Sequence, residues 1–265
     1  MSVLDPLSHA LAAVVVTAHD GLTTLGADPG SGATWVLAVA AVVVLVRLAL
    51  LPLVAQGVRQ AHAAARARPQ LRALAERYRG RTDPASLRRM REERKVIAAE
   101  HRLSALGCLP LLVQLPIVLA LYHLLSQVAA GTPVGPMTPG LVASLGAATL
   151  LGVPLADRGY VGLGPAHLTV VAGLALLAAG LSYVTQRYVV APNTLTDGVP
   201  QALASAQQLL PAVSAVSLLV AGGVVPVALV AYWVCNSTWT LAQSAVITRW
   251  FPTPGTPAAA RFAAR

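Results

Sequence analysis

Long apolar stretches separated by short polar ones dominate the hydrophobic pattern of this chain. The first, residues 35–56, has Arg47 as its single charged residue and is long enough to cross the roughly 30 Å hydrocarbon core of a bilayer as a helix. Trp35, at its start, is expected to anchor it at the interface. Similar stretches predict four further spans, at residues 105–128, 166–187, 209–223 and 226–247. The predicted fold class is an all-α polytopic membrane protein with five transmembrane helices.

The last two predicted spans come from one apolar stretch. As a single helix, residues 209–247 would be roughly 60 Å long, about twice the thickness of the hydrocarbon core. A helix of that length does not fit, so the chain is expected to fold back. Gly222, Gly223 and Pro226 are residue types that end helices and form turns, and they mark the expected turn.

A strongly basic stretch, residues 57–104, follows the first span. It holds 13 of the 19 Lys and Arg residues of the chain. A break from Gly80 to Pro84 separates its two weak apolar stripes, which predicts an antiparallel helical hairpin. Because short loops rich in Lys and Arg stay on the cytoplasmic side, we expect the hairpin and the C-terminus in the cytoplasm and the N-terminus outside.

The same topology assigns the other segments. Residues 1–34 form an external segment, in which residues 6–25 are expected to lie at the membrane surface as a helix. Residues 129–165 form an external loop, whose apolar segment 141–156 would be about 24 Å long as a helix and is expected to dip into the membrane without crossing it. A cytoplasmic loop and a short cytoplasmic tail are expected at residues 188–208 and 248–265.

Composition supports a membrane protein and argues against other classes. Hydrophobic residues make up 56% of the chain, charged residues 11%, and the mean hydropathy is +0.67. The net charge of +9 suits nucleic acid, yet Tyr78 is the only aromatic residue of the basic hairpin, so no base-stacking nucleic-acid module is expected. Cys108 and Cys235 lie far apart, in or beside apolar spans, and predict no disulfide framework.

Motifs of catalysis are weak. The six histidines show no HExxH spacing, and the spans contain no pair of carboxylates for acid–base chemistry. Gly180-Leu181-Ser182 has the form of the nucleophile motif of intramembrane serine proteases, with His123 or His167 as a conceivable base. A serine in a transmembrane helix is far more often a packing residue. We therefore predict a protein that is not an enzyme and that has no cofactor or metal.

Arg47 is the most informative single residue. A cation near the middle of a span costs about 2.5–3.5 kcal/mol unless it faces water or protein. The predicted spans contain no acid to pair with it, and snorkelling to the headgroups would strain the side chain. A hydrated interior lined by Gln114 and Asn236 explains these features, and ordinary interhelical hydrogen bonding of the two amides remains the alternative. For Gln186 and Gln243, near the interface, ordinary hydrogen bonding is favoured.

Three motifs in the right order resemble one known family, the YidC/Oxa1/Alb3 membrane protein insertases, in particular their actinobacterial form. They are Arg47-Leu-Ala-Leu-Leu-Pro52-Leu53, then Gly107-Cys108-Leu109-Pro110-Leu-Leu-Val-Gln114-Leu115-Pro116-Ile117, and finally Pro226-Val-Ala-Leu-Val-Ala-Tyr232-Trp233-Val-Cys-Asn236-Ser-Thr-Trp239-Thr240-Leu-Ala-Gln243. The chain departs from the family pattern at Leu103-Ser104, where members usually carry Asn-Pro. The resemblance covers nearly the whole chain.

The resemblance implies a bacterial cell-membrane protein with a hydrophilic groove, open to the cytoplasm and to lipid, that receives nascent membrane segments and releases them sideways. The implied groove residues are Arg47, Gln114, Gln186, Tyr232, Trp233, Asn236 and Gln243. The implied partners are nascent membrane proteins and the lipid bilayer, and further the ribosome, the signal recognition particle pathway and the Sec translocon. The alternative is a small-molecule or ion transporter that uses Arg47 as an anion site.

Overall fold

The computed structural model describes residues 5–103, 109–161, 164–195 and 201–264. Cys108 and Ser104, which enter the motifs above, lie outside the described residues. The elements are α1 (Asp5–Thr24), α2 (Gly32–Ala49), α3 (Leu51–Arg77), α4 (Pro84–Glu100), α5 (Leu109–Ala129), α6 (Pro139–Ala147), β1 (Thr149–Leu150), β2 (Val153–Pro154), α7 (Pro165–Val184), η2 (Thr185–Val190), η3 (Ala191–Asn193), α8 (Gln201–Gly222), α9 (Val227–Trp250) and α10 (Pro257–Ala263). The predicted all-α class is confirmed.

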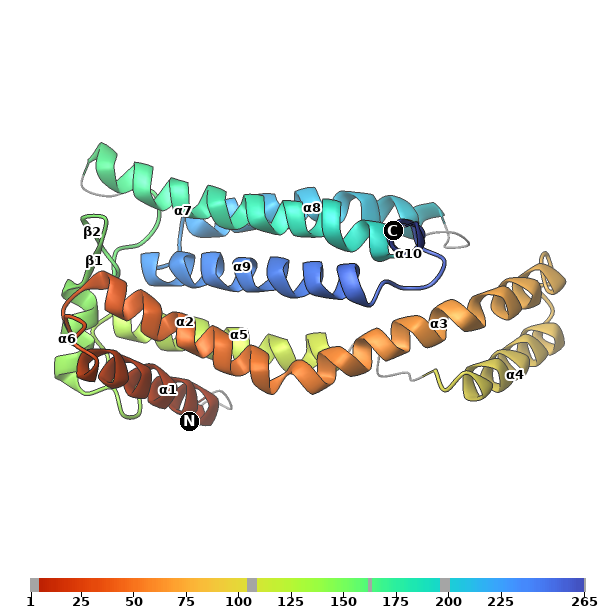
Figure 1. Cartoon of the computed structure of the whole chain (residues 1–265), viewed down its shortest axis with the longest axis horizontal. Coiled ribbons are helices and arrows are strands. Elements are labelled where there is room, and N and C mark those ends of the chain that lie inside the picture. Colours follow the sequence, from red (N-terminus) through yellow and green to blue (C-terminus); the bar gives the residue numbers. More distant parts are fainter. Residues whose placement is uncertain (1–4, 104–108, 162–163, 196–200, 265) are drawn as a thin grey trace.

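Two groups of helices form the body of the molecule (Figure 1). The helices α7, α8 and α9 make one group, and α1, α2 and α5 make the other. The two groups meet mainly where α9 packs against α2. Their shared core is apolar and includes the fully buried Leu121, Leu124, Val42 and Val227. This contact brings the first and last predicted spans together, although they are far apart in the sequence.

Four of the described helices are long and apolar enough to cross a membrane: α2, α5, α7 with its continuation to Asn193, and α8. The helix α9 falls short of that criterion because polar residues such as Asn236, Thr240 and Gln243 interrupt its apolar sequence. Its first turns are nevertheless buried, from Val227 to Tyr232. That α9 forms the fifth span stays a prediction.

The first span and the basic hairpin share one nearly continuous rod. The helix α2 ends at Ala49 and α3 begins at Leu51, so the predicted boundary at residue 56 lies within α3. Leu50 forms the joint, and hydrogen bonds continue across it, from Leu50 N to Val46 O and from Val54 N to Leu50 O, each 3.0 Å long. Pro52 is tolerated because it stands in the first turn of α3, where its missing N–H costs nothing.

The basic hairpin consists of α3 and α4 and projects from the body (Figure 1). Asp83 caps α4 by accepting a 2.8 Å hydrogen bond from Ser86 N. Near the tip, Glu93 accepts hydrogen bonds from Arg77 at 2.9 Å and from the Tyr78 hydroxyl at 2.7 Å. No residue of α4 is buried, so these polar contacts carry much of the pairing between the two arms.

The segment predicted to dip into the membrane folds as a compact cap. The cap segment, residues 137–160, contains α6 and an antiparallel hairpin of β1 and β2. Its apolar side chains Met137, Leu145 and Leu155 are buried in the common core. Residues 141–156 do not form the single helix expected from their composition, because α6 ends at Ala147 and the hairpin of β1 and β2 follows.

Trp35 lies beneath this cap and does not act as the expected interfacial anchor. Its side chain is 0% exposed, stacks on His19 with 4.0 Å between ring centroids, and donates a 3.3 Å hydrogen bond to Ser144 Oγ. The interaction with α6 replaces the headgroup contacts expected of such a residue. Gly32, one turn before Trp35, leaves room for the cap, since a Cβ there would overlap the Thr149 backbone.

The N-terminal helix α1 packs along α2 and α5. Its buried face contains Leu11, Ala12 and Val15. Ser8 Oγ donates a 3.2 Å hydrogen bond to the carbonyl of Ala120, near the middle of α5, so α1 follows the bundle over much of its length. Its location at the membrane surface stays a prediction.

Candidate functional site

Arg47 lies in the last turn of α2 and reaches across to α9. Its Nη2 donates two hydrogen bonds, to Asn236 Oδ1 at 2.8 Å and to Thr240 Oγ1 at 2.9 Å. Residues four apart on a helix lie on one face, which is why both acceptors of α9 meet the same guanidinium. The buried Nε has no hydrogen-bond partner among the described residues. The cation therefore links two helices through neutral groups.

The expected surroundings of Arg47 are partly present. Gln114 of α5 and Tyr232 of α9 line a narrow space beside it, together with Asn236, in a cavity of about 10 Å³. The rest of that lining is apolar and comes from Val42, Val43, Val46, Ile117 and Leu121. This side of Arg47 is thus closely packed, and it has room for about one water molecule at most.

The other face of Asn236 and Thr240 borders a much larger space. This polar hollow has a volume of about 380 Å³ and lies between α7, η2, α8 and α9. Its lining consists of Ser182, Thr185, Gln186, Ser214, Ser217, Leu218, Trp233, Asn236, Ser237 and Thr240. Eight of these ten residues carry hydroxyl or amide groups, and a space of this size and polarity favours ordered water.

A change of helix type places the amide of Gln186 at the polar hollow. The helix α7 passes into the wider turn of η2 at Thr185, whose hydroxyl donates to Leu181 O at 2.6 Å. Gln186 donates to Ser182 Oγ at 3.1 Å and accepts from Ser214 Oγ at 3.4 Å. Such wide turns occur often at functional sites. The amide joins α7 to α8 across the hollow.

The structure thus brings six of the seven predicted site residues to two adjoining spaces. Arg47, Gln114, Tyr232 and Asn236 share the narrow cavity, and Gln186 and Trp233 line the polar hollow with Asn236. Gln243 lies apart from both linings and accepts a 3.1 Å hydrogen bond from Trp239 Nε1. That these residues act on a substrate stays a prediction.

Sequence reasoning did not assign Thr240 or the serines of the polar hollow to the site. Thr240 accepts from Arg47 and donates to Asn236 O at 2.7 Å, which ties the cation to the backbone of α9. Its spacing of four residues from Asn236 was a usable signal. Serines such as Ser214 and Ser217 gave none, because small hydroxyl residues are common in packed membrane helices.

Comparison with known proteins identifies the family. A model of the family described as 60Kd inner membrane protein matches residues 27–254, most of the chain and all of the two linings. The chain belongs to this family. The predicted resemblance to the YidC/Oxa1/Alb3 proteins is confirmed.

Three relatives illustrate the likeness within the 60Kd inner membrane protein family, and each bears the name membrane protein insertase YidC. The protein of Streptomyces avermitilis is 30% identical over 91% of this chain and 56% of its own length. That of Tropheryma whipplei strain Twist is 26% identical over 96% of this chain and 86% of its own. The protein of Bifidobacterium longum is 23% identical over 97% and 78%. This chain spans little more than half of the Streptomyces protein.

Proposed function

We propose that this protein is a membrane protein insertase that accepts nascent membrane segments beside Arg47 and releases them sideways into the bilayer. The observation that carries the proposal is the bond from Arg47 to Asn236 and Thr240 at the edge of the polar hollow. A cation and a hydrated space among apolar helices shorten the distance over which the polar tail of a client must cross an apolar environment. The cost of moving its backbone and side-chain polar groups falls accordingly.

The direction of entry follows from charge and packing. The basic hairpin and the C-terminal helix α10 lie at the same end of the molecule (Figure 1), and His62 of α3 bonds to Phe251 O at 3.2 Å. The positive-inside rule puts this end in the cytoplasm and the cap segment outside. Clients then enter from the cytoplasmic end of a bacterial cell membrane, where the exposed arms of α3 and α4 would meet the ribosome, the signal recognition particle pathway or the Sec translocon.

The proposed mechanism needs no chemical step. The polar hollow offers hydroxyl and amide groups that exchange hydrogen bonds with a passing polypeptide. Free energy comes from partitioning of the apolar client segment into lipid, and acidic tails gain about 2.3 kcal/mol per charge for each 100 mV of membrane potential. Nothing in the comparisons favours the small-molecule transporter.

Site-specific photocrosslinking tests whether clients enter the polar hollow. A photoreactive residue replaces Ser217, which lines the hollow, and in a matched control replaces Val216, its neighbour outside that lining. Ribosome-bound chains of a single-span client are then irradiated in membranes that contain either variant. We expect adducts from position 217 and few from position 216. Equal yields would show that the client passes along the lipid-facing surface, and the proposal would fail.

Variants of Arg47 test the role of the charge. Arg47→Ala should reduce insertion of clients with acidic translocated tails more than insertion of clients with neutral tails, and Arg47→Lys should retain much of the activity. Protease protection of the client in proteoliposomes measures both. Normal insertion of both client types by Arg47→Ala would show that Arg47 is not part of the proposed client site. Anion uptake by the same proteoliposomes, lost with Arg47→Ala, would favour the transporter.

A further inference from the structure

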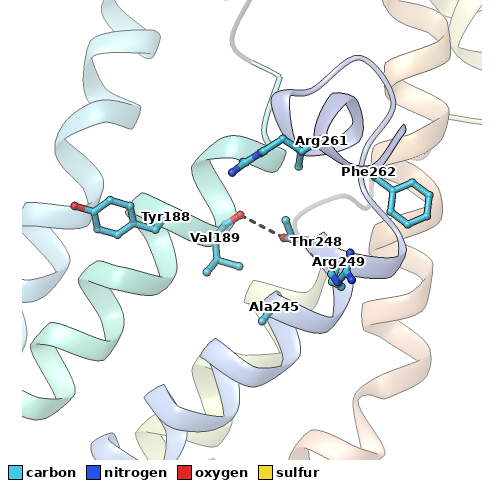
Figure 2. Close-up of a pocket in the computed structure, with 8 residues that line it drawn as sticks. Tyr188, Val189, Ala245, Thr248, Arg249, Arg261 and Phe262 are labelled. Carbon is cyan, nitrogen blue, oxygen red and sulfur yellow. Dashed lines mark hydrogen bonds between the residues drawn. The ribbon is translucent and has the colours of Figure 1, made fainter. Parts of the chain in front are cut away.

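A second hollow lies beside the C-terminal turns of α9, and Arg47 is not part of its lining. It has a volume of about 220 Å³, is open to the surface, and is lined by η2, the last turns of α9 and the short helix α10. Figure 2 shows Arg261 extending from α10 toward η2, and Arg249 at the end of α9 on the other side. Val189 and Phe262 contribute apolar surface. We name this space the two-arginine hollow.

The charge of the two-arginine hollow is uncompensated within the described part of the chain. No acidic residue is found in its described lining, and neither arginine forms a described ion pair. Arg261 Nε donates to Pro257 O at 3.3 Å, and the rest of the side chain extends toward η2 (Figure 2). Both arginines line this space, and guanidinium groups are suited to bind an oxyanion, since phosphate and carboxylate match their donor geometry.

Exposed aromatic rings near the two-arginine hollow are consistent with a position at a membrane interface. Tyr188 is 64% exposed, Trp250 60%, Phe251 56% and Phe262 48%, all within the chain segments that border it. Tyr and Trp gather at headgroup level, where the apolar part of the ring contacts acyl chains and the polar group contacts water. A phosphate ligand that reaches this depth carries an apolar body.

The hollow is also held in shape independently of any ligand. Asn193 Oδ1 accepts a 2.7 Å hydrogen bond from Thr253 N, which fastens the segment before α10 to η3. Thr248 Oγ1 donates to Val189 O at 3.3 Å, which joins α9 to η2 within the lining (Figure 2). Ala258 of α10 is buried. Both arginines therefore stand on elements whose positions relative to the bundle are held by bonds within the protein.

We propose that the two-arginine hollow binds the phosphate headgroup of an anionic phospholipid from the cytoplasmic leaflet. Basic pockets between membrane helices on this side bind anionic headgroups, and here the apolar surface of Phe262 and Val189 accompanies the glycerol and upper acyl region. Neither guanidinium takes part in the client site at Arg47. The lipid would hold η2, α9 and α10 together at the end of the bundle where clients are proposed to enter.

Equilibrium lipid binding tests this without any insertion assay, so its outcome is separate from that of the proposed function. The full chain in neutral detergent is titrated with phosphatidylglycerol or, as the zwitterionic control, phosphatidylcholine, and retained lipid is counted by native mass spectrometry. We expect one phosphatidylglycerol bound preferentially. Arg249→Gln and Arg261→Gln should each weaken it about fivefold, and the double variant more strongly.

Arg187→Gln is the matched control, because Arg187 is an exposed arginine of η2 outside the described lining. Its variant should bind phosphatidylglycerol as the parent does, and Arg249→Lys with Arg261→Lys should recover part of the loss, which separates charge from misfolding. An equal loss with Arg187→Gln would reduce the effect to general surface charge and overturn the proposal. Displacement of the lipid by inorganic phosphate at matched concentration, or no preference for phosphatidylglycerol, would overturn it as well.

Discussion

At the scale of single residues, Arg47 has no acidic partner within the part of the chain that the structure describes. Its described hydrogen-bond partners are the neutral acceptors Asn236 and Thr240. A carboxylate in their place would cancel the positive field, whereas an amide and a hydroxyl fix the guanidinium and leave the field intact. The arrangement suits a site that attracts acidic polypeptide segments transiently.

Removing Arg47 should lower the stability of the protein less than removing its two acceptors, Asn236 and Thr240. Arg47→Leu loses two interhelical hydrogen bonds, worth about 0.6 kcal/mol each on average, so the protein should stay folded. Asn236→Leu combined with Thr240→Val should lower the melting temperature more, because it strands a partly buried cation. The variant that combines all three substitutions should have a higher melting temperature than the double variant, because no cation is left without its acceptors. Melting temperatures in nanodiscs measure all three, and a larger loss for Arg47→Leu than for the double variant would contradict the account.

At the scale of elements, the cap segment depends on a glycine. Gly159 has φ of +69°, and a Cβ there would overlap the carbonyl of Gly223 in the turn between α8 and α9. Gly159→Ala should therefore destabilise the protein by at least the roughly 1–2 kcal/mol cost of the left-handed backbone.

Gly173 in α7 is the matched control, because a Cβ there meets nothing within 4 Å. Gly173→Ala should stabilise its helix by roughly 0.5–1 kcal/mol. Thermal unfolding of the two variants should shift in opposite directions. Unchanged or increased stability of Gly159→Ala would mean that the cap does not press on the turn at Gly223.

The tip of the basic hairpin should respond to alkaline pH. The hydrogen bond that Tyr78 donates to Glu93 raises the pKa of the Tyr78 hydroxyl above its ordinary value of about 10. The contact is complete below that ordinary value and is lost as the pH rises through the raised pKa, because the phenolate no longer donates. Spin labels at Ala75 and Arg91 should report a wider distance distribution at high pH. Tyr78→Phe should show that wider distribution already at neutral pH.

At the scale of the whole molecule, the topology has a direct test. In a background in which Cys108 and Cys235 are replaced by Ala, single cysteines are placed at Arg81, in the hairpin turn, and at Val161, which is 95% exposed beyond the cap segment. An impermeant thiol reagent added to intact cells should label position 161 alone. Added to inverted vesicles, it should label position 81 alone. Labelling of both from one side would disprove the predicted orientation.

The sequence predicts those parts of the fold that depend on local chemistry and length. The Gly222 to Pro226 turn and the break before Pro84 follow from residue types that end helices, and the structure has α8 and α3 end at Gly222 and Arg77. Arg47 was identifiable because a cation in an apolar stretch needs a polar neighbour. The burial of Trp35 was not, because it depends on α6, which is more than one hundred residues away. The same holds for the serines of the polar hollow.

The hydrogen bonds that connect α9 to its neighbours differ at the two ends of the bundle, so the two ends should differ in how readily they open. Near the cap segment, backbone groups bond directly to backbone groups: Val227 N donates to Asp157 O at 2.8 Å and Ala228 N to Leu155 O at 3.0 Å. At the other end, the described long-range bonds of α9 and its extension each use a side chain, as in the Thr253–Asn193 contact. Side-chain joints can rotate open one at a time, whereas separation at the capped end would leave the first two N–H groups of α9 without partners. The end of the bundle near α10 is therefore expected to open more readily than the capped end.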